Sequence, residues 1–250
     1  MRCGESVAVV TGGTGGIGTS ICEALAAIGF VVAVGYGKSQ QAAERLATKL
    51  PGTGHMALST PVTDSDGLQA MARIVHQRYG RCDALINCAG TTRFVAHADL
   101  DALDDGLIED ILATNVRGSF ASLRALLPLL RASTLPGGGA VVNISSIAAR
   151  TAMGSNVMYC ASKAAVDNMT RSLARALAPA VRVNSVSPGL VDTEFVKSLD
   201  QGWRDEQAAR TPLGRLASAN DVAAAVVAVI RDLTFTTGAI LAVDGGRPLQ

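Results

Sequence analysis

Two side chains in this sequence, Tyr159 and Lys163, combine residue types and a spacing that suit acid/base chemistry. They lie in a stretch with helical spacing of apolar residues, and residues four apart share one face of a helix. A free phenol titrates near roughly pH 10, and a nearby positive charge stabilises the phenolate and lowers that pKa. The pair could therefore act as a general acid/base. The alternative is an ordinary Tyr and Lys on the surface of a helix.

A glycine-rich turn over residues 11–18 is a second candidate site. It follows an apolar run at 7–10 and precedes helical apolar spacing, which is the context that a dinucleotide-binding fingerprint requires. Glycines let backbone N–H groups approach a pyrophosphate, and the N-terminus of a helix favours its negative charge. The glycines in question are Gly12, Gly16 and Gly18. The alternative is a tight turn that binds no ligand.

The chain after the second apolar run, 31–34, bears on the choice of cofactor. An NAD-selective domain carries an acidic residue about 20 residues past the glycines, but no Asp or Glu lies between Glu23 and Glu44. Without that carboxylate a 2′-phosphate is not repelled, and Lys38 with Ser39 could bind it. We therefore predict NADP, with NAD as the alternative. Lys38 could also be a solvated lysine of a loop.

Buried-type apolar runs alternate with helical patterns along the whole chain. Such alternation predicts a single-domain, Rossmann-type, doubly wound parallel sheet of seven strands flanked by helices. The expected strands are 7–10, 31–34, 56–58, 83–87, 140–144, 181–186 and 240–243. One long helix is expected over 106–130, and Asn115 inside it is a poor helix residue because its amide competes for backbone hydrogen bonds. Asn115 has either a specific role or an exposed position.

The composition excludes several other classes of protein. Of 250 residues 48% are apolar and 17% charged, with a formal charge of +1, so neither a nucleic-acid nor a membrane-surface partner is indicated. The longest apolar run, 222–230, is far shorter than the ~18 residues of a membrane span. The five cysteines and three histidines are scattered, which predicts reduced thiols, a cytoplasmic protein and no metal site.

These motifs, in this order, resemble those of the short-chain dehydrogenase/reductase family over nearly the whole chain. They are Thr11-Gly12 with Gly16-Ile17-Gly18, Asn87-Cys88-Ala89-Gly90, Asn115-Val116, Ser146, Tyr159 with Lys163, and Pro188-Gly189. Within the family the chain is most similar to 3-oxoacyl and acetoacetyl thioester reductases. The chain departs from the family pattern at Pro61, Cys88 and Gly15, and it lacks a basic residue near Ala180.

The resemblance implies a catalytic tetrad of Asn115, Ser146, Tyr159 and Lys163. Tyr159 would exchange a proton with the substrate oxygen, Lys163 would assist it, Ser146 would hydrogen-bond the carbonyl, and Asn115 would anchor a water. The implied cofactor contacts are Gly12, Thr14, Gly16, Ile17, Gly18, Tyr36, Lys38, Ser39, Val62, Asn87, Ala89, Gly90, Tyr159, Lys163, Pro188, Gly189, Val191 and Thr193.

The substrate region is expected at a small lid over about 190–216. Phe195, Leu199 and Trp203 are candidate apolar contacts there, unless they only pack the lid onto the body; Met153 is expected to face the pocket. Together with Ser146 and Tyr159, Met153 and Trp203 are the predicted substrate residues. Relatives of this family are mostly homotetramers, which implies one here.

We therefore expect an NADPH-dependent carbonyl reductase acting on a 3-oxoacyl thioester or a related ketone. An NAD(P)-dependent dehydrogenase that oxidises a secondary alcohol of sugar, polyol or steroid type is the second hypothesis. The third is a cofactor-binding regulator that has lost the reaction.

Overall fold

Seven parallel strands form one sheet in the computed structural model, which describes residues 6–249. The strand order is β3-β2-β1-β4-β5-β6-β7. The strands are β1 (Val7–Thr11), β2 (Val31–Tyr36), β3 (Met56–Ser59), β4 (Ala84–Asn87), β5 (Gly139–Ile144), β6 (Val181–Pro188) and β7 (Ile240–Val243). This confirms the predicted seven-stranded fold.

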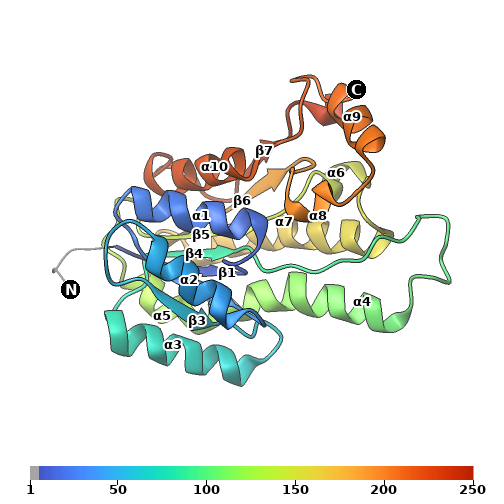
Figure 1. Ribbon diagram of the computed structural model, residues 1–250. Coiled ribbons are helices and arrows are strands. Elements are labelled where there is room, and N and C mark those ends of the chain that lie inside the picture. The colour runs from blue at the N-terminus through green and yellow to red at the C-terminus, as the bar shows by residue number, and fades with distance from the viewer. Residues whose placement is uncertain (1–5, 250) are drawn as a thin grey trace.

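Helices cover both faces of the sheet (Figure 1). The long helices are α1 (Gly16–Ala27), α2 (Gln40–Lys49), α3 (Ser65–Tyr79), α5 (Gly118–Arg131), α7 (Val157–Leu177) and α10 (Ala219–Arg231). The shorter ones are α4 (Asp105–Ile111), the π-helix η1 (Leu112–Arg117), α6 (Ala148–Thr151), α8 (Glu194–Lys197), α9 (Gln201–Ala209) and the 3₁₀ turn η2 (Arg247–Leu249). No helix within 6–249 has the length and apolarity needed to cross a membrane.

Two hydrophobic cores, one on each face of the sheet, hold these layers together. Successive side chains of a strand point to opposite faces, so Ala8 and Val10 pack with α1 and α10, while Val7 and Val9 pack with α3 and α5. All four residues are fully buried. The sequence of a strand buried on both faces is a continuous run of apolar residues, and this pattern made these strands predictable.

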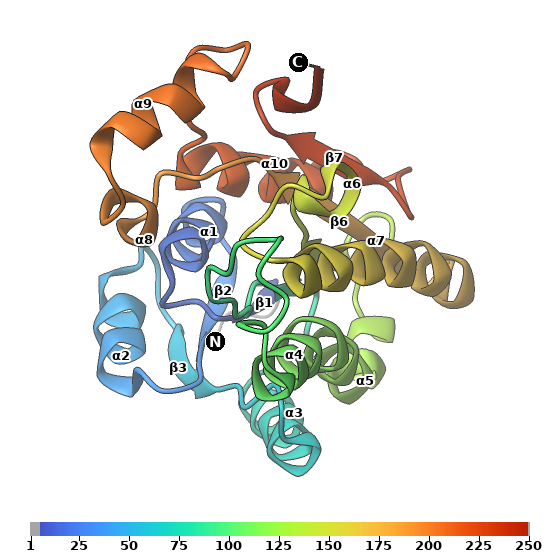
Figure 2. The same ribbon diagram turned by 90° about the vertical axis from the view of Figure 1, so that its right-hand side faces the viewer.

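The strand order reverses between β1 and β4, and ligands of such sheets bind beyond the carboxyl ends of the strands at this point. Figure 2 looks toward this edge. The long segment that follows β4 passes in front of β1, with α8 on one side and α6 and α7 on the other. The predicted site residues therefore have to meet here.

The helix expected over 106–130 is interrupted by a π-helical segment. Residues 105–131 are helical throughout, but η1 separates α4 from α5 and contains Asn115. Short π segments occur frequently at functional sites. Asn115 is only 1% exposed, so the interpretation of an exposed, tolerated Asn is wrong.

Candidate active site

Tyr159 and Lys163 lie one turn apart on α7 and face each other. Lys163 Nζ is 5.7 Å from the centre of the Tyr159 ring. The ammonium donates a 2.8 Å hydrogen bond to the carbonyl of Ile144, the last residue of β5, and the lysine is 7% exposed. Tyr159 is half-buried. The pair is therefore partly buried beside the carboxyl end of β5 rather than placed on a free helix surface.

Gly90 brings the other predicted residues to this pair. A Cβ placed on Gly90 would lie 3.3 Å from Asn115 Oδ1 and 3.9 Å from Lys163 Nζ. Segments that are far apart in the sequence thus meet at one point, beyond the ends of β4 and β5. Any side chain at position 90 would narrow the space between the Asn115 amide and the Lys163 ammonium.

The Asn115 side chain is committed to two hydrogen-bond partners on different segments. Its Oδ1 accepts from the Thr91 N–H at 2.8 Å, and its Nδ2 donates to the Thr91 carbonyl and to Ser162 Oγ, both at 3.1 Å. Its own carbonyl accepts from Ser119 Oγ at 2.8 Å. The role expected for Asn115, anchoring a water, stays a prediction. The hydrogen bonds to Thr91 and Ser162 give Asn115 a second role, which is structural.

Ser146 lies between β5 and α6, and its Oγ accepts a 3.1 Å bond from the Ala148 N–H. The next residue, Ile147, donates its N–H to the Pro188 carbonyl at 2.9 Å, which joins this loop to the end of β6. Ser145, the preceding residue, is buried, and its Oγ has no hydrogen-bond partner among the described residues. Ser146 is the more accessible of the two serines.

The glycines of the turn let backbone segments pack more closely than side chains would permit. A Cβ on Gly18 would lie 2.9 Å from Gly13 Cα, and one on Gly12 would lie 2.8 Å from Ala89 Cα. Gly12 has φ +64°, which also favours glycine. Thr11 Oγ1 accepts from the Cys88 and Ala89 N–H groups at 3.2 Å, so the turn is held against the segment after β4. This close backbone packing fits a pyrophosphate cradle.

The remaining predicted cofactor residues border the same edge of the sheet. A Cβ on Gly16 would lie 3.0 Å from Thr193 Cγ2, so the start of the lid reaches the glycine turn. Val191 forms a bridge with Ala217, and Gly189 lies against Asp244. Val62 packs near Gly118 at the start of α5. Thr14 is half-buried in the turn itself, and Ile17 packs against the core from α1.

Asn87 differs from the others because its side chain turns into the protein. It is 4% exposed, and its Nδ2 donates to the Ser119 carbonyl at 3.1 Å and to Asn143 Oδ1 at 2.8 Å. Asn143 Nδ2 in turn donates to Thr170 Oγ1 at 2.8 Å. The Asn87 amide thus supports the strands beneath the predicted active site and does not line that site.

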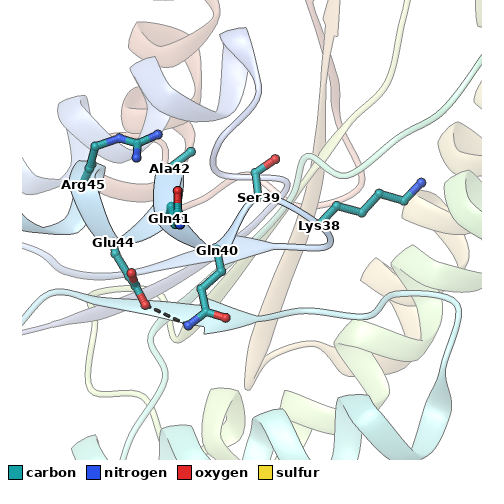
Figure 3. Close-up of a pocket in the computed structure, with 7 residues that line it drawn as sticks. All are labelled: Lys38, Ser39, Gln40, Gln41, Ala42, Glu44 and Arg45. Carbon is teal, nitrogen blue, oxygen red and sulfur yellow. Dashed lines mark hydrogen bonds between the residues drawn. The ribbon is translucent and has the colours of Figure 1, made fainter.

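Lys38 and Ser39 border a hollow of about 690 Å³ between β2 and α2 (Figure 3). Both are exposed, and Tyr36 is half-buried at the end of β2. In Figure 3 the Lys38 side chain extends away from Arg45, which lies on the α2 side. Glu44 also borders the hollow, and its Oε1 accepts a 2.8 Å bond from Gln40. Two basic residues, Lys38 and Arg45, and one acidic residue, Glu44, thus border the hollow.

The residues predicted to meet the substrate lie on two separate segments. Met153, 50% exposed, follows α6, and Trp203, 38% exposed, lies on α9. Leu199 is also exposed, at 40%, whereas the Phe195 side chain lies outside the described residues. An ion pair of 2.7 Å between Asp192 and Arg204 joins the start of the lid to α9.

Burial controls the ionisation of groups around the pair. It raises the pKa of the Cys88 thiol to about 11, although the nearby Lys163 charge acts in the opposite direction. Burial also raises the pKa values of Cys22, Cys82 and Cys160, and all four described cysteines are free thiols. Cys3 lies outside the described residues. At neutral pH these thiols are neutral and therefore poor nucleophiles.

Sequence reasoning missed Asn156, the residue three positions before Tyr159. It is 1% exposed and caps α7: its Oδ1 accepts a 2.7 Å bond from the Tyr159 N–H. The signal was available, since Asn is a preferred N-cap residue. Its partners in another segment, the Thr92 hydroxyl and the Arg93 carbonyl, could not be read from the local sequence.

Known proteins resemble this chain over its whole length. A family profile described as enoyl-(acyl carrier protein) reductase matches residues 12–247. The cis-4-hydroxycyclohexanecarboxylate dehydrogenase of Sinomonas cyclohexanicum is 38% identical, over 97% of this chain and 96% of its own. The 3-oxoacyl-[acyl-carrier-protein] reductase FabG of Staphylococcus aureus is 32% identical, over 96% of each chain.

Among solved structures, a short-chain dehydrogenase/reductase from Brucella melitensis, titled glucose/ribitol dehydrogenase, superposes with a TM-score of 0.88. It is 28% identical and covers 97% of this chain and 96% of its own. The profile, the relatives and the fold all point to one family. The chain belongs to the short-chain dehydrogenase/reductase family, whose members are NAD(P)-dependent oxidoreductases acting on CH–OH or carbonyl groups.

Proposed function

We propose that the protein is an NADPH-dependent carbonyl reductase that reduces a ketone, with 3-oxoacyl thioesters as the preferred substrate class. The observation that carries this proposal is the position of Lys163: its Nζ lies 5.7 Å from the centre of the Tyr159 ring and, together with Asn115 Oδ1, borders Gly90. These residues lie at the edge of the sheet where such folds bind dinucleotides. The resemblance to a 3-oxoacyl reductase over 96% of the chain supports the substrate class.

The cofactor, when bound, supplies the hydride. Tyr159 then donates its phenolic proton to the substrate oxygen, which gains negative charge as it is reduced. Lys163 supplies a positive charge beside the phenol and favours the phenolate that remains. Ser146 donates a hydrogen bond to the same oxygen, and Asn115 holds the segment after β4 against α7 and anchors a water for the return of the proton.

The glycine turn and the neighbouring loops hold the cofactor in this proposal. Gly12, Gly16 and Gly18 allow the close backbone packing of the turn, whose N–H groups would approach the pyrophosphate, and the segment from Pro188 to Thr193 would border the nicotinamide. Lys38 and Ser39 bind the 2′-phosphate of NADP, with Arg45 adding a second positive charge at the same hollow. Glu44 weakens this preference, so NAD remains the alternative cofactor.

The substrate enters beneath the lid over residues 190–216 of this single domain. Trp203 of α9 and Met153 after α6 present the exposed apolar surface that an acyl chain requires. A homotetramer located in the cytoplasm completes the proposal.

An NAD(P)-dependent dehydrogenase of secondary alcohols is the second candidate. The 38% identical relative that is named as a dehydrogenase of a hydroxylated ring compound favours it. The same side chains serve both directions, because a group that donates a proton in reduction accepts one in oxidation. A regulator without activity is disfavoured because all four tetrad positions are filled.

The test is the absorbance of the reduced nicotinamide with acetoacetyl-CoA, comparing NADPH and NADH. We expect rapid oxidation of NADPH and slow oxidation of NADH. Oxidation of neither, with cofactor binding intact, would contradict the ketoacyl proposal. A panel of secondary alcohols with NAD and NADP would then test the second candidate.

A further inference from the structure

The segment that follows β4, Thr91–Val95, is tied to Ser155 and Asn156, directly before α7, by side-chain and backbone hydrogen bonds. Asn156 Nδ2 donates to the Arg93 carbonyl at 2.8 Å and to Thr92 Oγ1 at 3.2 Å. The Val95 N–H donates to the Ser155 carbonyl at 2.8 Å, and the hydroxyls of Thr92 and Ser155 are 2.6 Å apart. We call Thr91–Val95 the clamped segment.

Both backbone groups of Tyr159, its N–H and its carbonyl, form hydrogen bonds with side chains. Its N–H donates to Asn156 Oδ1 at 2.7 Å, and Asn156 reaches Thr92 and Arg93 with its other amide atom. Its carbonyl accepts from Ser162 Oγ at 2.8 Å. Ser162 Oγ in turn accepts from Asn115, which bonds both backbone groups of Thr91. Two chains of hydrogen bonds therefore run from the clamped segment to one residue.

The burial of Asn156 makes its amide hard to replace. At 1% exposure, its oxygen and nitrogen have no access to water as a substitute partner. A buried polar group left without a partner is destabilising, whereas a fully paired one fixes the geometry of its neighbours. The amide joins two segments that are more than 60 residues apart, with an acceptor on one side and a donor on the other.

We propose that Asn156 is a positioning residue: it couples the clamped segment to Tyr159 and so sets the phenol against the reacting oxygen. The inference rests on the proposed role of Tyr159 as the proton donor. It assigns separate tasks to the two ends of the amide. Oδ1 caps α7 at the Tyr159 N–H, and Nδ2 fixes the distance from this turn to the segment beside Gly90.

Two variants separate these tasks. Asn156→Ala removes both, whereas Asn156→Ser keeps a good capping oxygen and removes the donor to Arg93. Displacing a catalytic group by about 1 Å can lower a rate by about 100-fold. We expect kcat with acetoacetyl-CoA to fall roughly 10- to 100-fold in the Ala variant and roughly 10-fold in the Ser variant. The Kd for NADPH should change less than about threefold in both.

Asp64→Ala is the matched control, because Asp64 caps α3 through the Asp66 N–H at 3.0 Å. It should lower Tm by about 2–4 °C, as expected for the loss of one cap, and leave kcat unchanged. If Asn156→Ala does not fold, Thr92→Val keeps the shape and the α7 cap but removes the Thr92 contact to Asn156. It should also lower kcat several-fold.

Hydrogen–deuterium exchange makes the test independent of the substrate. Peptides covering 91–97 should exchange faster in Asn156→Ala and Asn156→Ser than in the wild type, while Tyr159→Phe should exchange as the wild type does. Wild-type kcat in Asn156→Ser, or unchanged exchange over 91–97 in Asn156→Ala, would overturn the inference. Absence of any turnover by the wild type would instead overturn the proposed function, and the exchange result would still decide the coupling.

Discussion

At the scale of single residues, spacing predicted that Tyr159 and Lys163 lie together better than it predicted the hydrogen-bond partners of the residues around them. A helix is enough to bring together two residues that are four apart, such as Tyr159 and Lys163. In the structure Lys163 Nζ lies 5.7 Å from the centre of the Tyr159 ring. The partners of Asn115, by contrast, lie 24 and 47 residues away. Such contacts depend on how β4, η1 and α7 pack, and no local pattern encodes this packing.

Asp167, one turn after Lys163, gives a prediction about stability and pH. Its Oδ1 is buried without a standard hydrogen bond to any described residue, although the Ser145 hydroxyl is near enough to favour its charged form. Burial raises the pKa of Asp167 above its ordinary value of 3.8, and Ser145, Arg171 and Lys163 oppose this only in part. The folded protein thus binds the proton more tightly than the unfolded chain, and stability falls as pH rises through this window.

Asp167→Asn removes the charge and should therefore stabilise the protein at pH 7. We expect a gain below about 1 kcal/mol, since the half-buried carboxylate is partly screened by water. The gain should vanish as the pH falls below the unfolded pKa of the aspartate, where both states are protonated. Thermal unfolding of both proteins from pH 7 to pH 3 measures it. A gain that grows toward acid pH would contradict this account.

At the scale of secondary-structure elements, the strands were predictable and the connections between them were not. Polar residues lie side by side on neighbouring strands: Thr11 pairs with Asn87, Asn87 with Asn143, and Asn143 with Ser185. This row crosses the strands β1, β4, β5 and β6 near their carboxyl ends, beneath the predicted active site. In the sequence each residue only looks like the polar end of an apolar run, because the register that aligns them is a property of the sheet.

Thr170 of α7 joins this row to the helix that carries Tyr159. Its Oγ1 accepts from Asn143 Nδ2 and is 2.8 Å from Ser185 Oγ, and it is fully buried. Thr170→Val keeps the shape and leaves both partners unpaired, which should cost about 1–3 kcal/mol of unfolding free energy. Urea unfolding measures the loss, with Thr48→Val on exposed α2 as the control, where we expect less than about 0.5 kcal/mol. Equal losses in the two variants would contradict a buried network.

At the scale of the whole molecule, the sheet ends in a strand that is paired on one side only. β7 pairs with β6, and its other edge is free in the described chain. Ile240, Leu241 and Val243 are half-buried, and Phe120 on α5 is 42% exposed. Unpaired edges and exposed apolar side chains favour association. The alternation of strands and helices predicted the single chain's fold, but which surfaces remain open became visible only in three dimensions.

We therefore expect a homotetramer in solution. Light scattering coupled to size exclusion should give a mass close to four times the 25.6 kDa of one chain. Ala242→Lys, at an exposed position of β7, should shift the distribution toward smaller species because it places a charge on the outermost strand of the sheet. A monomer peak for the wild type would refute the tetramer.

The central claim is that Tyr159 transfers the proton beside a bound nicotinamide. It is tested most directly by single-turnover oxidation of NADPH with acetoacetyl-CoA in the wild type and in Tyr159→Phe, at NADPH concentrations that saturate both. Loss of a positioned general acid typically lowers the rate 10²- to 10⁴-fold. We predict a loss of at least about 100-fold in Tyr159→Phe, with the Kd for NADPH nearly unchanged. Equal rates in the two proteins would contradict the account.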